Sequence, residues 1–268
     1  MLKRYPLISF FVFAYALTWL AWIPLALRGP VYGDRLSYLH FVGSLGPLVS
    51  AVVMTGLVSG RSGVRELLGR VFRWRVPLGW HLLAWFGPAA LYAIAAVVVR
   101  VMWSQWPKLS LFGHSEEFAQ LAMPVYWVLS IICYGFGEEV GWRGFALPRL
   151  QQRYSGLTSA VIMSVFWALW HLPVFWFSRG MSQMGPGEIV GWYFSLLTGS
   201  LLLTWMCNGA RGSVLIVAVF HAMLNVAMTS PSPGSLSNVM GAALTIWGLF
   251  SIRALRRPQP RSSGPACS

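Results

Sequence analysis

Long apolar runs constrain this chain more than any other feature of its sequence. A helix rises ~1.5 Å per residue and the hydrocarbon core of a bilayer is ~30 Å thick, so about twenty apolar residues cross it. Eight runs approach or reach that length, and they cover approximately residues 7–27, 38–59, 79–103, 123–145, 156–177, 188–208, 213–230 and 237–252. The sequence therefore predicts an all-α polytopic membrane protein with about eight transmembrane helices.

The composition excludes an ordinary soluble protein. Hydrophobic residues make up 56% of the 268 residues and charged residues only 10%, against roughly 45–50% and 25% in a soluble domain. The lipid bilayer must therefore be the solvent for most of the chain. The formal net charge of +13 would suggest a nucleic-acid partner in a soluble protein. In a membrane protein, Lys and Arg gather in cytoplasmic loops, so we expect no nucleic-acid partner.

The positive charges also predict the orientation of the chain in the cell membrane. If the amino terminus is cytoplasmic, fifteen Lys and Arg residues fall on the cytoplasmic side and five on the outside. The positive-inside rule then places both termini of this multi-pass protein in the cytoplasm. We expect residues 1–252 to form the membrane domain. Residues 253–268, rich in Arg, Pro and Ser, are predicted to form a basic, disordered cytoplasmic tail.

Two adjacent carboxylates, Glu138 and Glu139, lie in the fourth apolar run. A charge at membrane depth costs at least ~2.5–3.5 kcal/mol, which makes a functional role the default hypothesis. On a helix, Glu139 precedes Arg143 by four residues, the favourable arrangement for an ion pair. Glu138 lies ~140° around the axis from Arg143. We therefore interpret Glu139–Arg143 as a structural pair and Glu138 as a free carboxylate facing a polar cavity. The alternative is that both carboxylates extend to the cytoplasmic interface.

Two histidines fall deep inside apolar runs, and each belongs to a short helical motif. His171 follows Trp167 by four positions, so the two rings share a helix face. His221 and Asn225 are also four positions apart and can converge on one point. An intramembrane His can equally serve as a hydrogen-bond partner between helices. Allowing for helix tilt, one polar cavity in the cytoplasmic half of the membrane can hold these side chains together with Glu138.

These residue types favour hydrolysis by activated water, because no Ser or Cys nucleophile with an attendant base accompanies them. Glu138 would act as general base and His171 would hold the water. His221 and Asn225 would donate hydrogen bonds to the developing oxyanion. Glu138, His171 and His221 would also suit a divalent metal such as zinc, although the H-E-x-x-H motif is absent. The residue types do not decide between a site with a metal and one without.

Three motifs, E-E-x-x-x-R, aromatic-x-x-x-H and H-x-x-x-N, follow one another on successive predicted helices, and this order resembles the CPBP family. They are formed by Glu138, Glu139 and Arg143, by Trp167 and His171, and by His221 and Asn225. The family includes the CAAX prenyl endopeptidases of the Rce1 type and bacterial bacteriocin-processing or immunity proteins. The resemblance covers about residues 123–230, the expected catalytic core. Leu45-Gly46-Pro47 is similar to a weaker family feature, and the family usually has Phe in place of Trp167.

The resemblance implies an intramembrane endopeptidase that acts on a membrane-associated protein or peptide. It implies water activation by Glu138 with help from His171, and oxyanion stabilisation by His221 and Asn225. It does not imply a prenylated substrate, because nothing in this sequence marks a prenyl-binding groove. The alternative is a non-catalytic membrane protein, a transporter or bacteriocin-immunity factor, in which the same residues form a proton relay or a structural network.

Overall fold

The computed structural model describes residues 2–232 and 234–256, and within these ranges every regular element is a helix. In chain order the elements are α1 (Pro6–Arg28), η1 (Arg35–Ser37), α2 (Tyr38–Ser44), α3 (Gly46–Val71), α4 (Leu78–Trp103), η2 (Leu109–Leu111), α5 (Met123–Leu129), η3 (Ser130–Phe136), α6 (Gly137–Glu139), η4 (Val140–Ala146), α7 (Leu147–Gln151), α8 (Gly156–Trp170), α9 (Val174–Phe177), α10 (Arg179–Ser182), α11 (Pro186–Gly209), α12 (Val214–Met228) and α13 (Gly234–Leu255). The prediction of an all-α protein is confirmed. Most of the predicted cytoplasmic tail, residues 257–268, lies outside the described residues.

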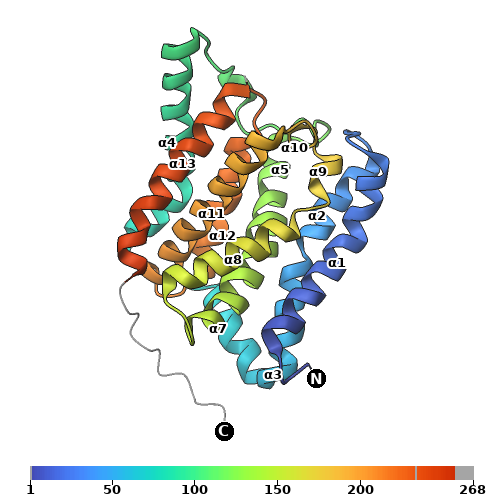
Figure 1. Cartoon of the computed structure of the whole chain (residues 1–268), viewed down its shortest axis with the longest axis vertical. Coiled ribbons are helices and arrows are strands. Elements are labelled where there is room, and N and C mark those ends of the chain that lie inside the picture. The colour runs from blue at the N-terminus through green and yellow to red at the C-terminus, as the bar shows by residue number, and fades with distance from the viewer. Residues whose placement is uncertain (1, 233, 257–268) are drawn as a thin grey trace.

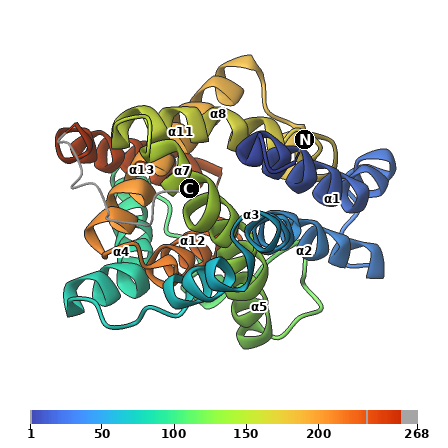
Figure 2. The same cartoon turned by 90° about the horizontal axis from the view of Figure 1, so that it is seen from below.

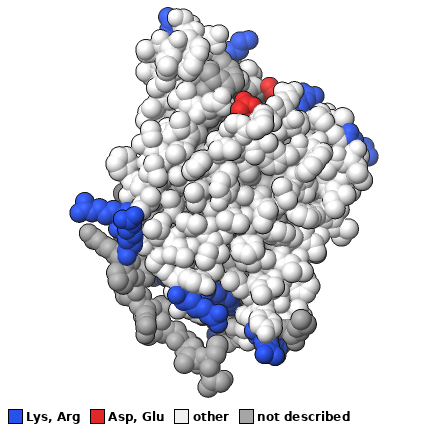
Figure 3. All heavy atoms as spheres, viewed as in Figure 1, with Lys and Arg blue, Asp and Glu red and all other residues white. Residues whose placement is uncertain are grey.

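Several of these helices suit a membrane. Five helical units in the described part of the chain are long and apolar enough to cross one: α1, the unit Arg35–Val71, α4, α11 and most of α13. α8 and α12 are apolar as well, with 15 residues each. On the face drawn in Figure 3, the charged side chains lie mostly toward the two ends of the molecule, and much of the surface between them carries none. The prediction of a polytopic membrane protein is confirmed.

Each predicted apolar run coincides with helical structure, but three runs are not single regular helices. The run 38–59 is divided into α2 and α3, and Pro47 lies in the first turn of α3, where its missing N–H costs no hydrogen bond. The run 123–145 continues to Gln151 as one uninterrupted rod of α5, η3, α6, η4 and α7, which we call the site helix. In the run 156–177, helix α8 ends at Trp170, because Pro173 has no N–H to continue the hydrogen bonds of the helix. The short helix α9 follows from Val174.

The helices form a bundle around the site helix. α4 and α13 lie at one side of the bundle and α1 and α2 at the other (Figures 1 and 2). α12 packs against both η3 and α4, α3 packs against η4, and α11 packs along α13. The start of α1 and the end of α13 lie toward the same end of the molecule (Figure 1). The site helix is therefore held between α3 on one side and α12 on the other.

Two glycines let these neighbours come close to the site helix. A Cβ atom on Gly135 would lie 2.5 Å from the carbonyl oxygen of Ala218 on α12. A Cβ atom on Gly141 would lie 2.8 Å from the carbonyl oxygen of Pro47 on α3. Small residues allow such close backbone approach between membrane helices. Because both glycines flank the Glu138–Glu139 pair, the carboxylates lie where α3 and α12 approach the site helix closely.

Arg70, near the end of α3, ties the site helix to the turn that precedes α12. Its Nη2 and Nη1 donate hydrogen bonds to the carbonyl oxygens of Arg143 and Gly144, at 2.9 and 3.0 Å. Its Nε donates to the carbonyl oxygen of Gly212 at 3.4 Å. Charged donors make stronger hydrogen bonds than neutral ones. One guanidinium thus connects three segments that together position the predicted site.

Candidate active site

The site helix departs from regular α-helical geometry on both sides of the two carboxylates. η3 and η4 are π-helical, and only the short α6, which contains Glu138 and Glu139, is α-helical between them. π-Helical turns are rare and often occur at functional sites. The wider turns alter which side chains share a face, so the contacts of each carboxylate follow from the structure rather than from ideal helical angles.

Glu139 and Arg143 form the predicted ion pair. The Nη1 atom of Arg143 lies 2.9 Å from Oε1 of Glu139, and both side chains are 0% exposed. The guanidinium also donates from Nη2 to the hydroxyl of Ser200 on α11 at 3.4 Å, and it lies over the ring of Trp167 at 5.0 Å. A buried ion pair of this kind offsets the cost of placing either charge in the membrane.

Glu139 has a second partner that sequence reasoning missed. The Nδ1 atom of His221, on α12, lies 2.8 Å from the same carboxylate oxygen, Oε1. An ionised carboxylate only accepts hydrogen bonds, so Nδ1 carries the proton and the imidazole has a fixed orientation. Glu139 therefore does more than neutralise Arg143, because it also positions His221.

Glu138 is separate from this ion pair, as the sequence predicts. Its side chain is 3% exposed, and its Oε2 accepts a hydrogen bond from the indole Nε1 of Trp167 at 2.8 Å. Sequence reasoning gave Trp167 no such role. The two neighbouring carboxylates thus have different surroundings: Glu139 is paired with a cation, whereas Glu138 accepts from a neutral donor.

His171 lies at the carboxyl end of α8, beside the same tryptophan. Its Nδ1 is 2.8 Å from the backbone carbonyl oxygen of Trp167, so Nδ1 carries the proton and Nε2 is left for another partner. The imidazole is half-buried among indole rings, with centroids 4.8 Å from Trp170, 5.7 Å from Trp167 and 5.9 Å from Trp192. The predicted shared face of His171 and Trp167 is thus present.

Asn225 lies one turn beyond His221 on α12 and is half-buried. Its backbone carbonyl accepts a hydrogen bond from Thr229, but the structure shows none for its side-chain amide among the described residues. The amide is therefore available to a ligand. Among the predicted residues, the structure joins Glu138, Glu139, Arg143 and His221 through contacts that centre on Trp167. His171 borders this group, and Asn225 continues it along α12.

The described side chains do not gather into a metal site. Nowhere in residues 2–232 and 234–256 do three His, Cys, Asp or Glu side chains come together as a ligand set. Of the conceivable ligands Glu138, His171 and His221, the two imidazoles have Nδ1 hydrogen-bonded to protein oxygens, which leaves Nε2 of each for another partner. We derive no step through a metal. A cavity of about 470 Å³ between α4 and α13 is lined by apolar residues such as Leu91 and Trp247, so it is not the predicted polar cavity.

The fold and the site define a class: multi-pass membrane proteins with a buried centre of carboxylates and imidazoles. Residues 120–227 match the family model described as type II CAAX prenyl endopeptidase Rce1-like. This segment contains all six predicted site residues. The chain is also 22% identical over 230 residues to a protein of Methanococcus maripaludis named CAAX prenyl protease 2, covering 81% of this chain and 82% of the relative. The resemblance to CAAX endopeptidases is confirmed, and with it the prediction of a peptidase.

Removal of either partner of the Glu139–Arg143 pair should strongly destabilise the protein, because the other charge is then buried without its counterion. We expect Arg143→Met and Glu139→Gln each to lower the free energy of unfolding by about 3–5 kcal/mol, and the double variant to recover part of that loss. Unfolding of the purified protein in detergent measures this, with Arg65→Met on the exposed surface of α3 as matched control. Single variants as stable as the control would contradict the pairing.

Proposed function

We propose that this chain is an intramembrane endopeptidase of the CAAX-protease type that hydrolyses a membrane-associated protein or peptide with water activated by Glu138. The observation that carries the proposal is the different environment of two adjacent buried carboxylates. Glu139 is neutralised by Arg143, while Glu138 accepts its hydrogen bond from a neutral indole, that of Trp167. A carboxylate without a cationic partner retains the capacity to take a proton, which a general base requires.

The reaction needs one water molecule and no covalent enzyme intermediate. Glu138 takes a proton from the water as the water oxygen bonds to the carbonyl carbon of the substrate. The same proton then passes from Glu138 to the amide nitrogen as the C–N bond breaks, and this releases a carboxylic acid and an amine. The new acid then loses its proton to the released amine or to water. His171 assists by holding the water through its remaining ring nitrogen, Nε2.

His221 and Asn225 stabilise the negative oxygen that forms during the attack. Donation from Nε2 of His221 requires the imidazolium, because Nδ1 already carries the proton directed at Glu139. With His221 in that form, Glu138, Glu139, Arg143 and His221 together have no net charge, which suits a site buried in lipid. The uncommitted amide of Asn225, one turn away, adds a second donor.

The name of the relative supports a proposal for the substrate, and the distribution of Lys and Arg supports a proposal for the orientation in the membrane. The archaeal relative is named a CAAX prenyl protease, and we propose for this chain the wider class of membrane-associated proteins or peptides, with or without a prenyl group. We also propose that both termini lie in the cytoplasm, since this orientation places most Lys and Arg on that side.

The role of Glu138 as base predicts that Glu138→Gln abolishes cleavage while the protein stays folded. The amide has nearly the same shape but cannot accept a proton, and a general base typically contributes ~10²–10⁴-fold to the rate. Single-turnover cleavage of an intramembrane peptide reporter by purified protein in liposomes measures the loss. Glu66→Gln, an exposed carboxylate on α3, is the matched control. Turnover near that of the wild type in Glu138→Gln would falsify the assignment.

The role of Asn225 separates an enzyme from a proton relay. Loss of one oxyanion donor should lower kcat in Asn225→Ala by ~10²–10³-fold with little change in KM. An amide does not carry a proton at accessible pH, so a relay would tolerate the same change but stop in His221→Ala. Asn238→Ala, at an exposed position of α13, is the control in the same assay. Unaltered cleavage by Asn225→Ala would contradict the oxyanion role of Asn225 but not the proposed peptidase activity.

The proposed orientation predicts where reporter fusions become active. A fusion after Arg75 or Arg256 should report the cytoplasm, and a fusion after Lys108 should report the outside, because the positive-inside rule fixes all three. Paired phosphatase and fluorescent-protein fusions in cells make the measurement. A reversed signal at Lys108 alone would show that α4 does not cross the membrane, and reversal at all three sites would invert the topology.

A further inference from the structure

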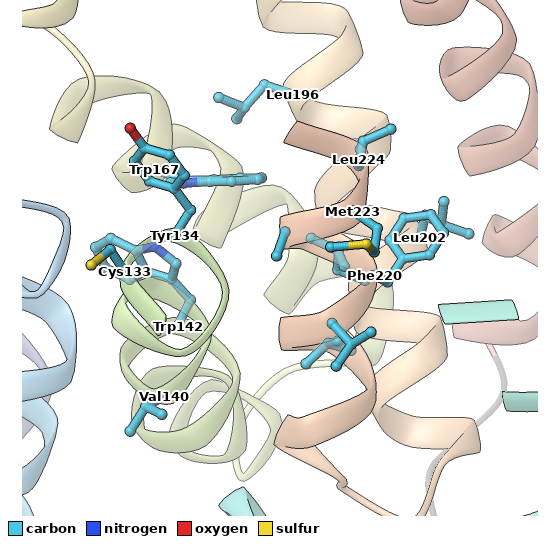
Figure 4. Packing of buried hydrophobic residues seen from close by; sticks show 14 of the residues in the cluster. Cys133, Tyr134, Val140, Trp142, Trp167, Leu196, Leu202, Phe220, Met223 and Leu224 are labelled. Atoms are coloured by element: carbon cyan, nitrogen blue, oxygen red, sulfur yellow. The ribbon is translucent and has the colours of Figure 1, made fainter. Parts of the chain in front are cut away.

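Trp167 contacts four of the predicted site residues: Glu138, His171, His221 and Arg143. Its Nε1 donates to Oε2 of Glu138 at 2.8 Å, and its backbone carbonyl accepts from Nδ1 of His171 at 2.8 Å. Its ring meets that of His221 edge-on at 5.3 Å, and the guanidinium of Arg143 lies over the ring at 5.0 Å. In Figure 4 the indole extends from the side of the site helix toward α12. One side chain from α8 therefore contacts residues of both other motifs.

The indole N–H divides the two oxygens of Glu138 into unequal roles. An indole donates one hydrogen bond and accepts none, so it cannot take a proton from the carboxylate. Oε2 is held by this bond, which leaves Oε1 as the oxygen that can meet a water molecule. Trp142, the other indole near Glu138, also interacts with its carboxylate, but its Nε1 makes no hydrogen bond of the length and angle that Trp167 makes.

We propose that Trp167 is a positioning residue that fixes the rotamer of Glu138 and thereby selects Oε1 as the base. This proposal rests on the proposed function, since it assigns the geometry with which Glu138 meets water. Phenylalanine at this position would keep one aromatic ring beside His171, His221 and Arg143 but would leave Oε2 without its donor. The role is therefore carried by one N–H group and is separable from the packing of the ring.

Trp170 supplies a matched control three residues away. It is 0% exposed, and its Nε1 donates a buried hydrogen bond to the hydroxyl of Thr18 at 2.9 Å. Its ring lies 4.8 Å from that of His171, so it also borders the site. Trp170→Phe removes the same chemical group from the same helix without touching Glu138. A merely structural role for Trp167 would make the two substitutions equivalent.

The first test compares kcat and KM of the wild type and three variants in liposomes with the intramembrane peptide reporter. Trp167→Phe should lower kcat by ~10–100-fold, the range expected for loss of a hydrogen bond to a charged group, and leave KM within about twofold. Trp170→Phe should keep kcat near that of the wild type. Benzothienylalanine at position 167 keeps the two-ring shape and exchanges N–H for sulfur. This replacement should reproduce the loss of kcat, while the melting temperature stays that of the wild type.

The outcomes distinguish this proposal from the proposed function. Full kcat with benzothienylalanine at position 167 would overturn the positioning role and leave the peptidase intact. Equal losses of kcat and stability in Trp167→Phe and Trp170→Phe would reduce Trp167 to a packing residue. Absence of cleavage by the wild type and by Trp170→Phe in every lipid would overturn the proposed function and this role with it.

A second measurement tests the contact without any activity. In protein labelled with ¹⁵N at the indole nitrogens, the Trp167 signal is identified by its loss in Trp167→Phe. Glu138→Ala should shift that signal and leave the Trp170 signal in place, because Trp167 donates to Glu138 whereas Trp170 donates to Thr18. An unmoved Trp167 signal would show that the hydrogen bond is not formed and would overturn the proposal, whatever the cleavage assay reports.

Discussion

Burial of the Arg143 guanidinium against Glu139 is the interaction on which the rest of this site depends. Both side chains are 0% exposed, and His221 bonds to the same carboxylate oxygen. Without this network each charge in the bundle would cost several kcal/mol, and a second carboxylate beside it would cost more still. The close approach of α3 and α12 to the site helix, together with the bonds from Arg70, brings the partner groups within reach. The protein can then hold Glu138 in a buried position without a cation bonded directly to it.

This division between the two carboxylates links the fold to chemistry. A carboxylate bonded to a guanidinium is a poor proton acceptor, so a bond from Arg143 to Glu138 would remove the base. Here the i, i+4 spacing assigns Arg143 to Glu139, and α8 supplies a neutral donor to Glu138. α12 contributes the imidazole of His221 and, on its next turn, the uncommitted amide of Asn225. Such an arrangement suits attack by water on a carbonyl group better than it suits a proton relay, in which Asn225 has no function.

The helices and the ion pair could be predicted from the sequence because both depend on local order. Apolar runs fix where helices lie, and the spacing of Glu139 and Arg143 fixes their contact. The bond from His221 to Glu139 and the bond from Trp167 to Glu138 join residues 82 and 29 positions apart. Such contacts depend on helix tilt and rotation, which spacing along one chain does not encode. The π-helical turns could not be predicted either, because no residue type is specific to them. The glycines around Glu138 do indicate close helix packing.

The central claim is that water, activated by Glu138, attacks the peptide bond directly. Cleavage of a peptide reporter by the purified protein in liposomes, in ¹⁸O-water with hydroxylamine present, tests it most directly. Direct attack predicts one ¹⁸O atom in the new carboxyl group and no hydroxamate, because no acyl-enzyme forms for hydroxylamine to intercept. A hydroxamate product would contradict this account, since it would require a nucleophilic side chain and a covalent intermediate in place of water held by Glu138.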